Sequence, residues 1–136
     1  MSEENVEAFR RGGIDAINRR DVEALLEDVD PEVEWHPAVL VPFEGEATVY
    51  RGREGVREMV GDLFEALAEF YVQYPEIRDL GDRIVAIGRV RTRGRESGAV
   101  TESPFAAVTD FRNGKAVRVQ TYLDPKEALE AAGLSE

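Results

Sequence analysis

The dipeptide Asn113-Gly114 constrains the fold more than any other feature, because it lies between two long apolar runs with strand character. A type I′ turn needs positive φ at both central residues, and Asn-Gly meets this requirement readily. We therefore expect an antiparallel hairpin made of residues 100–112 and 116–123. In a hairpin without irregularities, Arg112 faces Lys115 and Phe105 faces Tyr122.

The remaining pattern places helices before a run of strands. Two further strands are expected at residues 71–78 and 84–93, where the turn signals LGD and RESG mark their ends. The second half of the chain therefore predicts a four-stranded antiparallel meander. Apolar residues at helical spacing predict helices over residues 2–18, 22–29, 53–70 and 125–132. This order is typical of an α+β domain in which helices cover one face of a curved sheet.

Composition limits the classes of function. A chain of 136 residues fits a single domain, 1–136, and its net charge of −11 disfavours nucleic acids and anionic lipids as partners. The absence of cysteine excludes disulfides, thiolate metal sites and cysteine nucleophiles. No apolar run approaches the ~20 residues of a membrane span, and the N-terminus lacks a secretory signal, so we expect a cytoplasmic protein with no membrane partner.

The expected hairpin has two faces that differ in chemistry. One face is aromatic and polar, and the other is aliphatic; the first holds Phe105, Ala107, Thr109, Phe111, Gln120, Tyr122 and Asp124. Ligand pockets are mostly apolar with a few polar groups, which predicts that the mixed face lines a pocket. Neither face suits water, and we expect the helices to cover only one. The other face should then meet a second subunit, as in a homodimer, or be enclosed by the curvature of the sheet.

The order helix, helix, Trp-bearing strand, Gly-flanked helix and meander resembles the SnoaL-like branch of the NTF2-like superfamily, which includes relatives of ketosteroid isomerase and polyketide cyclases. The segments that carry the resemblance cover almost the whole chain: INRRDVEALLEDVDPEVEW, YRGREGVREMV, LGDRIVAIGRVRTRG, FRNGKAVRVQTYLD and KEALEAAGL. The resemblance implies a cone-shaped α+β barrel with an internal pocket, commonly paired as a dimer through the sheet. Because the family is chemically diverse, it implies no single reaction.

Asp124 has two competing interpretations. Polyketide cyclases of this family use an aspartate near the end of the last strand as acid or base, and Asp124 resembles it in position. A desolvated carboxylate has the raised pKa that such proton transfer needs. Locally, however, Asp-Pro-Lys-Glu has every feature of a helix start, with Asp124 as N-cap and Pro125 in the first turn. Capping amides stabilise the anion, so the two roles compete.

Seven further residues are candidates for the pocket. His36, the single histidine, is either a strand or rim residue or a hydrogen-bond donor, and Arg89 either lies in a solvated row of arginines or meets an oxygen of the ligand. The others are pocket walls or hydrogen-bond partners, and otherwise simply core: Trp35, Tyr50, Phe105, Gln120 and Tyr122. One histidine and scattered acids provide no metal-ligand spacing, so we expect no metal and no cofactor.

These features lead to two hypotheses. In the first, the pocket binds a small apolar or partly oxygenated molecule, and Asp124 transfers protons in a cofactor-free isomerisation, cyclisation or dehydration. In the second, the protein is a non-catalytic ligand-binding or dimerisation module, and Asp124 only caps the last helix. The sequence does not choose between them.

Overall fold

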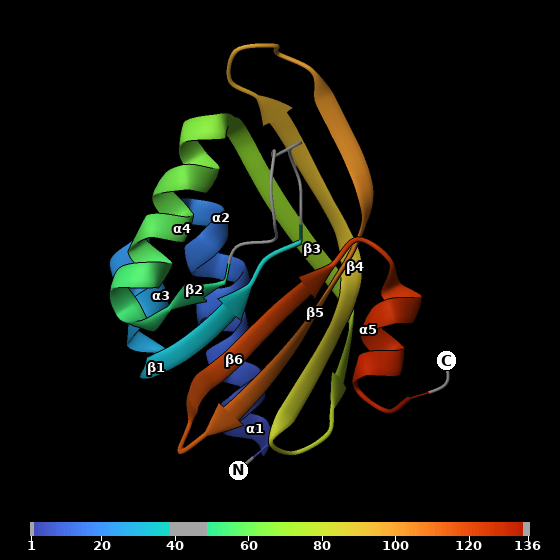
Figure 1. Cartoon of the computed structure of the whole chain (residues 1–136). Helices are drawn as coiled ribbons and strands as arrows, with labels where there is room; N and C mark the ends of the chain where they lie inside the picture. Colours follow the sequence, from blue (N-terminus) through green and yellow to red (C-terminus); the bar gives the residue numbers. More distant parts are fainter. Residues whose placement is uncertain (1, 39–48, 135–136) are drawn as a thin grey trace.

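The computed structural model describes residues 2–38 and 49–134, which form one six-stranded sheet and its helices (Figure 1). The strands lie in the order β2-β1-β6-β5-β4-β3. Along the chain, the elements are α1 (Ser2–Ala8), η1 (Phe9–Ala16), α2 (Ile17–Arg19), α3 (Val22–Glu27), β1 (Val29–His36), β2 (Tyr50–Arg51), α4 (Gly52–Ala66), β3 (Leu67–Asp79), β4 (Arg83–Gly94), β5 (Val100–Arg112), β6 (Lys115–Tyr122) and α5 (Pro125–Ala131). The curved sheet with helices from the N-terminal and middle parts of the chain confirms the predicted α+β class.

The first predicted helix is confirmed as a continuous run, but its middle is a π-helix, η1. The run ends at Arg20, which has a left-handed φ of 62°. Asp21 is the N-cap of the next helix, because its carboxylate accepts a hydrogen bond from the Ala24 amide at 3.1 Å. π-helical turns are uncommon and often border functional sites. Here η1 forms part of the wall of an internal cavity, described below.

The predicted boundary between the third helix and the first strand of the meander is wrong. The helix was expected to continue to Phe70, but α4 ends at Ala66 and β3 begins at Leu67. Pairing with β4 explains the difference, since Leu67 lies opposite Gly94 and Phe70 opposite Thr92. Leu67 and Phe70 are both buried, so the sheet and the core override the helical spacing of the apolar residues.

The Asn-Gly turn is confirmed, with φ of 53° at Asn113 and 76° at Gly114, and Arg112 pairs with Lys115. Further along the hairpin the predicted register is wrong, because the pairing shifts between Asp110 and Phe111. One extra residue in β6 moves every later side chain of that strand to the opposite face.

The shift exchanges the partners of the two strands. Tyr122 faces Ala106 instead of Phe105, and Gln120 faces Val108. Both therefore lie on the opposite face from Phe105, contrary to the prediction that the three share one face. Val119 and Thr121 take the inner positions in their place.

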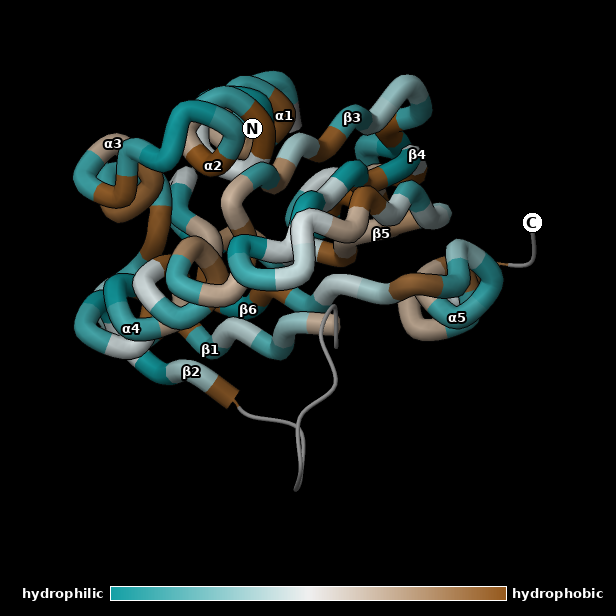
Figure 2. Tube along the Cα trace, turned by 90° about the horizontal axis from the view of Figure 1, so that it is seen from above, coloured by the Kyte–Doolittle hydropathy of each residue, from teal (hydrophilic) through white to brown (hydrophobic). Residues whose placement is uncertain are grey.

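The expectation that helices cover only one face is also wrong, because α5 packs against the outer face (Figure 1). Seen from above, α5 lies on the opposite side of the sheet from α1, α2, α3 and α4 (Figure 2). A second, smaller core forms there from buried Val85, Ala106, Val108, Ala128 and Leu129. Much of the apolar area that suggested a second subunit is thus covered within the chain itself.

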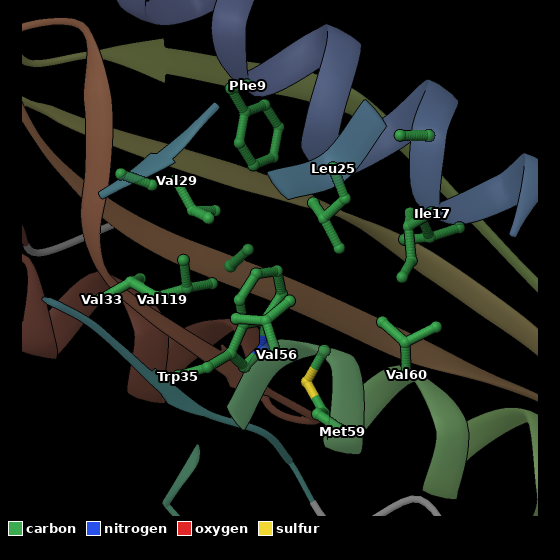
Figure 3. Packing of buried hydrophobic residues seen from close by; sticks show 14 of the residues in the cluster. Phe9, Ile17, Leu25, Val29, Val33, Trp35, Val56, Met59, Val60 and Val119 are labelled. Carbon is green, nitrogen blue, oxygen red and sulfur yellow. The ribbon is translucent and has the colours of Figure 1, made fainter. Parts of the chain in front are cut away.

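The main core lies between the inner face of the sheet and the helices. Figure 3 shows Phe9, Ile17 and Leu25 from the helices near Trp35 of β1 and Val119 of β6. β1 runs parallel to β6, and Trp35 lies opposite Val119. This packing leaves unfilled space around the Trp35 ring, which forms the candidate site.

Candidate functional site

Two adjoining pockets, each partly open to the surface, lie between the sheet and the helices, and together they form a cavity with two lobes. The lobes have volumes of about 40 and 70 Å³, and both are lined by Gly13, Trp35, Tyr74 and Thr121. We call them the first lobe and the second lobe. The first lobe extends toward η1 and α3, with Phe9, Leu25 and Ala107 on its walls. The second extends toward α4, with Met59, Leu63 and Phe105.

Trp35 reaches the cavity because of strand alternation in β1. Val33 and Trp35 are buried on the inner face, with exposed fractions of 0% and 9%. His36 follows Trp35 and therefore points to the other side of the sheet. There its Nε2 lies 3.2 Å from Oε1 of Glu34. The single histidine does not line either lobe.

Tyr74 reaches the cavity through an irregularity in β3, where the pairing with β4 shifts between Gln73 and Glu76. The two strands approach closely at this bulge. A Cβ on Gly88 would overlap the carbonyl oxygen of Gln73 and lie 2.8 Å from Cα of Tyr74. Glycine at position 88 therefore permits the backbone geometry that places Tyr74 between the two lobes.

The aromatic walls pack in a chain around Tyr74. Its ring centroid lies 5.5 Å from that of Phe9 and 6.3 Å from that of Phe105, and Phe105 meets Phe70 edge-on at 6.5 Å. These distances are typical of stabilising aromatic pairs. Burial raises the pKa of the Tyr74 phenol, so the hydroxyl stays protonated and neutral.

Polar groups on the cavity wall are few. The hydroxyl of Thr121 accepts a hydrogen bond from the Ala38 amide at 2.7 Å. Thr109 is 2% exposed, and its hydroxyl has no hydrogen-bond partner among the described residues. Asp28 borders the first lobe, and its Oδ1 accepts a hydrogen bond from Nη2 of Arg11 at 2.9 Å. This set can hold a mostly apolar molecule and contact a few of its polar atoms.

The structure brings only two of the predicted pocket residues, Trp35 and Phe105, to the cavity wall. Tyr50 lies elsewhere and donates from its hydroxyl to Asp62 Oδ2 at 3.0 Å. Arg89 is exposed and lies opposite Pro104 on the outer face.

The shifted register separates the other two residues from the cavity. Gln120 accepts a hydrogen bond from Arg118 at 2.9 Å, and Tyr122 packs against the smaller core under α5. Neither side chain lines either lobe.

Asp124 is exposed and acts as the N-cap of α5. Its Oδ1 accepts a hydrogen bond from the Lys126 amide at 2.9 Å, and Pro125 occupies the first turn. Asp124 does not line either lobe. The geometry therefore favours the capping interpretation, as the local Asp-Pro-Lys-Glu rule predicts.

Three polar residues of the cavity were missed as site candidates. Thr109 was placed on the pocket face but had no signal beyond its position. Thr121 would lie on the opposite face of a regular hairpin, and nothing in the sequence marks the extra residue in β6 that brings it inward. Asp28 directly follows α3, and an acidic residue at the end of a helix gives no indication of a binding site.

The sequence of the chain matches the model of one protein family. The model of the SnoaL-like domain matches residues 11–119, which is more than half of the chain. The chain belongs to the SnoaL-like domain family. No curated protein sequence matches this SnoaL-like domain.

Solved structures share the fold of the SnoaL-like domain over almost its whole length. An NTF2-like protein of unknown function from Burkholderia pseudomallei is 25% identical, with a TM-score of 0.79 and coverage of 93% of this chain and 95% of that one. TerC, co-crystallised with polyporic acid, is 24% identical, with a TM-score of 0.78 and coverage of 93% and 96%. A protein with a ketosteroid isomerase-like fold from Catenulispora acidiphila, in complex with trimethylamine, is 15% identical, with a TM-score of 0.73 and coverage of 99% and 96%. The predicted NTF2-like fold is confirmed.

None of the helices within residues 2–38 and 49–134 has the length and apolar character needed to cross a membrane. Over the same residues, no group of three or more His, Cys, Asp or Glu side chains could hold a metal ion.

Proposed function

We propose that this SnoaL-like domain binds a small, largely apolar molecule in the internal cavity. The observation that carries the proposal is the meeting of two aromatic-lined lobes at Trp35 and Tyr74. Pockets of this composition bury most of the surface of a ligand and orient it through a few polar atoms. Proteins of the same fold give further support, since TerC was crystallised with polyporic acid and the Catenulispora acidiphila protein with trimethylamine.

The single tryptophan provides a direct binding assay. Trp35 lines both lobes and is the only tryptophan in the sequence, so its emission reports on the cavity alone. We expect toluene to change the intensity and wavelength of this emission in a saturable way. Unchanged emission up to the aqueous solubility limit of toluene would contradict the proposal.

Proton transfer is a second candidate function, and the position of Asp28 favours it. Its side chain is 13% exposed, and among the described residues it provides the one carboxylate on either lobe. Oδ1 is held by Arg11, while Oδ2 lies beside Gly12, which also lines the first lobe. In this position the carboxylate could take a proton from the carbon next to a carbonyl and return one to the same carbon, without a cofactor.

Exchange of the α-hydrogens of cyclohexanone in D₂O, followed by NMR, tests this second function. We expect the protein to accelerate exchange and Asp28→Asn to remove the acceleration. Arg11→Gln is the matched control, because it breaks the ion pair and keeps the carboxylate; its stability cost should be small, since Arg11 is exposed. Loss of exchange in Asp124→Asn instead would identify Asp124 as the base. No acceleration by the unmodified protein would favour a non-catalytic binding protein.

A homodimer through the sheet stays a prediction. The part of the outer face that α5 leaves uncovered includes Tyr71 and Val100, whose exposed fractions are 51% and 52%. Sedimentation as a monomer at micromolar concentration would contradict it.

A further inference from the structure

The hydroxyl of Thr109 is the one buried side-chain polar atom of the described residues that lacks a hydrogen-bond partner. The residue lies on the inner face of β5, between Ile84 of β4 and Val119 of β6, and it lines the first lobe. Buried hydroxyls nearly always have a partner, because desolvation without a new hydrogen bond is unfavourable. The residue that carries this hydroxyl lines a cavity that the proposed function assigns to a ligand.

The other groups on the cavity wall show which ligand chemistry fits. Among the described residues, no lysine, arginine or histidine lines either lobe. The Asp28 carboxylate is already paired with Arg11, and Thr121 already accepts from the Ala38 amide. Tyr74 offers a neutral phenol to both lobes. A carboxylate or phosphate on the ligand would therefore meet no cation, and its negative charge would be buried without a compensating positive charge.

We propose that Thr109 Oγ1 is the hydrogen-bond site for a neutral, apolar ligand that carries a hydroxyl or carbonyl oxygen into the first lobe. This inference rests on the proposed function. It narrows the class of ligand to alcohols, phenols and ketones and excludes anions. The threonine hydroxyl can donate to a carbonyl oxygen, and it can donate to or accept from a hydroxyl. Shape and apolar contacts hold the rest of the ligand.

Toluene and p-cresol form a suitable pair of probes, because they differ by one hydroxyl group. Calorimetric titration of each probe should be carried out on the unmodified protein, Thr109→Val and Thr109→Ser. We expect Thr109→Val to weaken p-cresol binding about five-fold, the effect of one neutral hydrogen bond, and to leave toluene binding unchanged. Thr109→Ser keeps a hydroxyl and should keep most of the p-cresol affinity.

Thr92→Val is the matched control. Thr92 is also buried, with an exposed fraction of 7%, but it lies in β4 and lines neither lobe. Its replacement should leave the affinity for both probes unchanged. The anion p-toluate should bind at least ten-fold more weakly than p-cresol.

Several outcomes would overturn the inference. Equal loss of toluene and p-cresol affinity in Thr109→Val would mean that the residue acts through shape, and unchanged p-cresol affinity would mean that the hydroxyl makes no contact. Binding of p-toluate as tight as that of p-cresol would contradict a neutral ligand. A melting temperature of Thr109→Val well below that of Thr92→Val would show that the hydroxyl has a structural partner. Failure of both probes to bind the unmodified protein would instead overturn the proposed function together with this inference.

Discussion

Replacement of Gly88 by alanine is expected to destabilise the protein by about 3 kcal/mol or more, a large fraction of the 5–15 kcal/mol typical of a domain. The new Cβ would overlap the backbone carbonyl of Gln73 and approach Cα of Tyr74 to 2.8 Å. Both obstacles are backbone atoms in a paired strand, so they cannot move aside as a flexible side chain would. The β3 bulge would have to open, and Tyr74 would lose its position between the lobes.

Gly61→Ala is the control for this experiment. Gly61 lies in the exposed part of α4, and no atom lies within 4 Å of a Cβ built there. Alanine should stabilise that helix by up to about 1 kcal/mol. Urea unfolding followed by circular dichroism compares the two variants with the parent. Equal stability of Gly88→Ala and the parent would contradict the close approach of β3 and β4 at this position.

Ala107→Leu is expected to reduce toluene binding at least ten-fold. Ala107 is 2% exposed on the inner face of β5, and its methyl group borders the first lobe. The three added carbon atoms would occupy space of the same order as the lobe itself, about 40 Å³. Ala107→Val should produce a smaller loss, because affinity should fall with each added carbon.

Ala86→Val separates cavity filling from general overpacking. Ala86 lies directly opposite Ala107, is fully buried and lines neither lobe. Its enlargement should cost about 1–3 kcal/mol of stability, measured by urea unfolding, and should leave toluene affinity unchanged. If Ala107→Leu bound toluene as tightly as the parent, ligand binding in the first lobe would be excluded.

The parts of the fold that depend on local patterns were predictable from the sequence. The Asn113-Gly114 turn, the Asp21 cap and the four-stranded meander follow from turn chemistry, capping and alternation, and all three are present. The end of α4 was not predictable in this way. Leu67 and Phe70 continue the helical spacing, and only their pairing with β4 makes them part of a strand.

The site was less predictable, because it depends on a single inserted residue. A regular hairpin places Gln120 and Tyr122 beside Phe105, whereas the shift near Asp110 turns both side chains outward. Register errors of this kind exchange the two faces of a strand completely. For Asp124 the local capping rule was the better guide, since it needs no assumption about distant pairing.

The most direct test of the central claim is an isotope-filtered NOE spectrum of the labelled protein with bound toluene. Ligand binding in the internal cavity predicts contacts from toluene to methyl groups on its walls, namely those of Ala107 and Val119 in the first lobe or of Met59 in the second. Contacts confined to Ala106 and Val108, on the outer face under α5, and to Leu129 of α5 itself would contradict it.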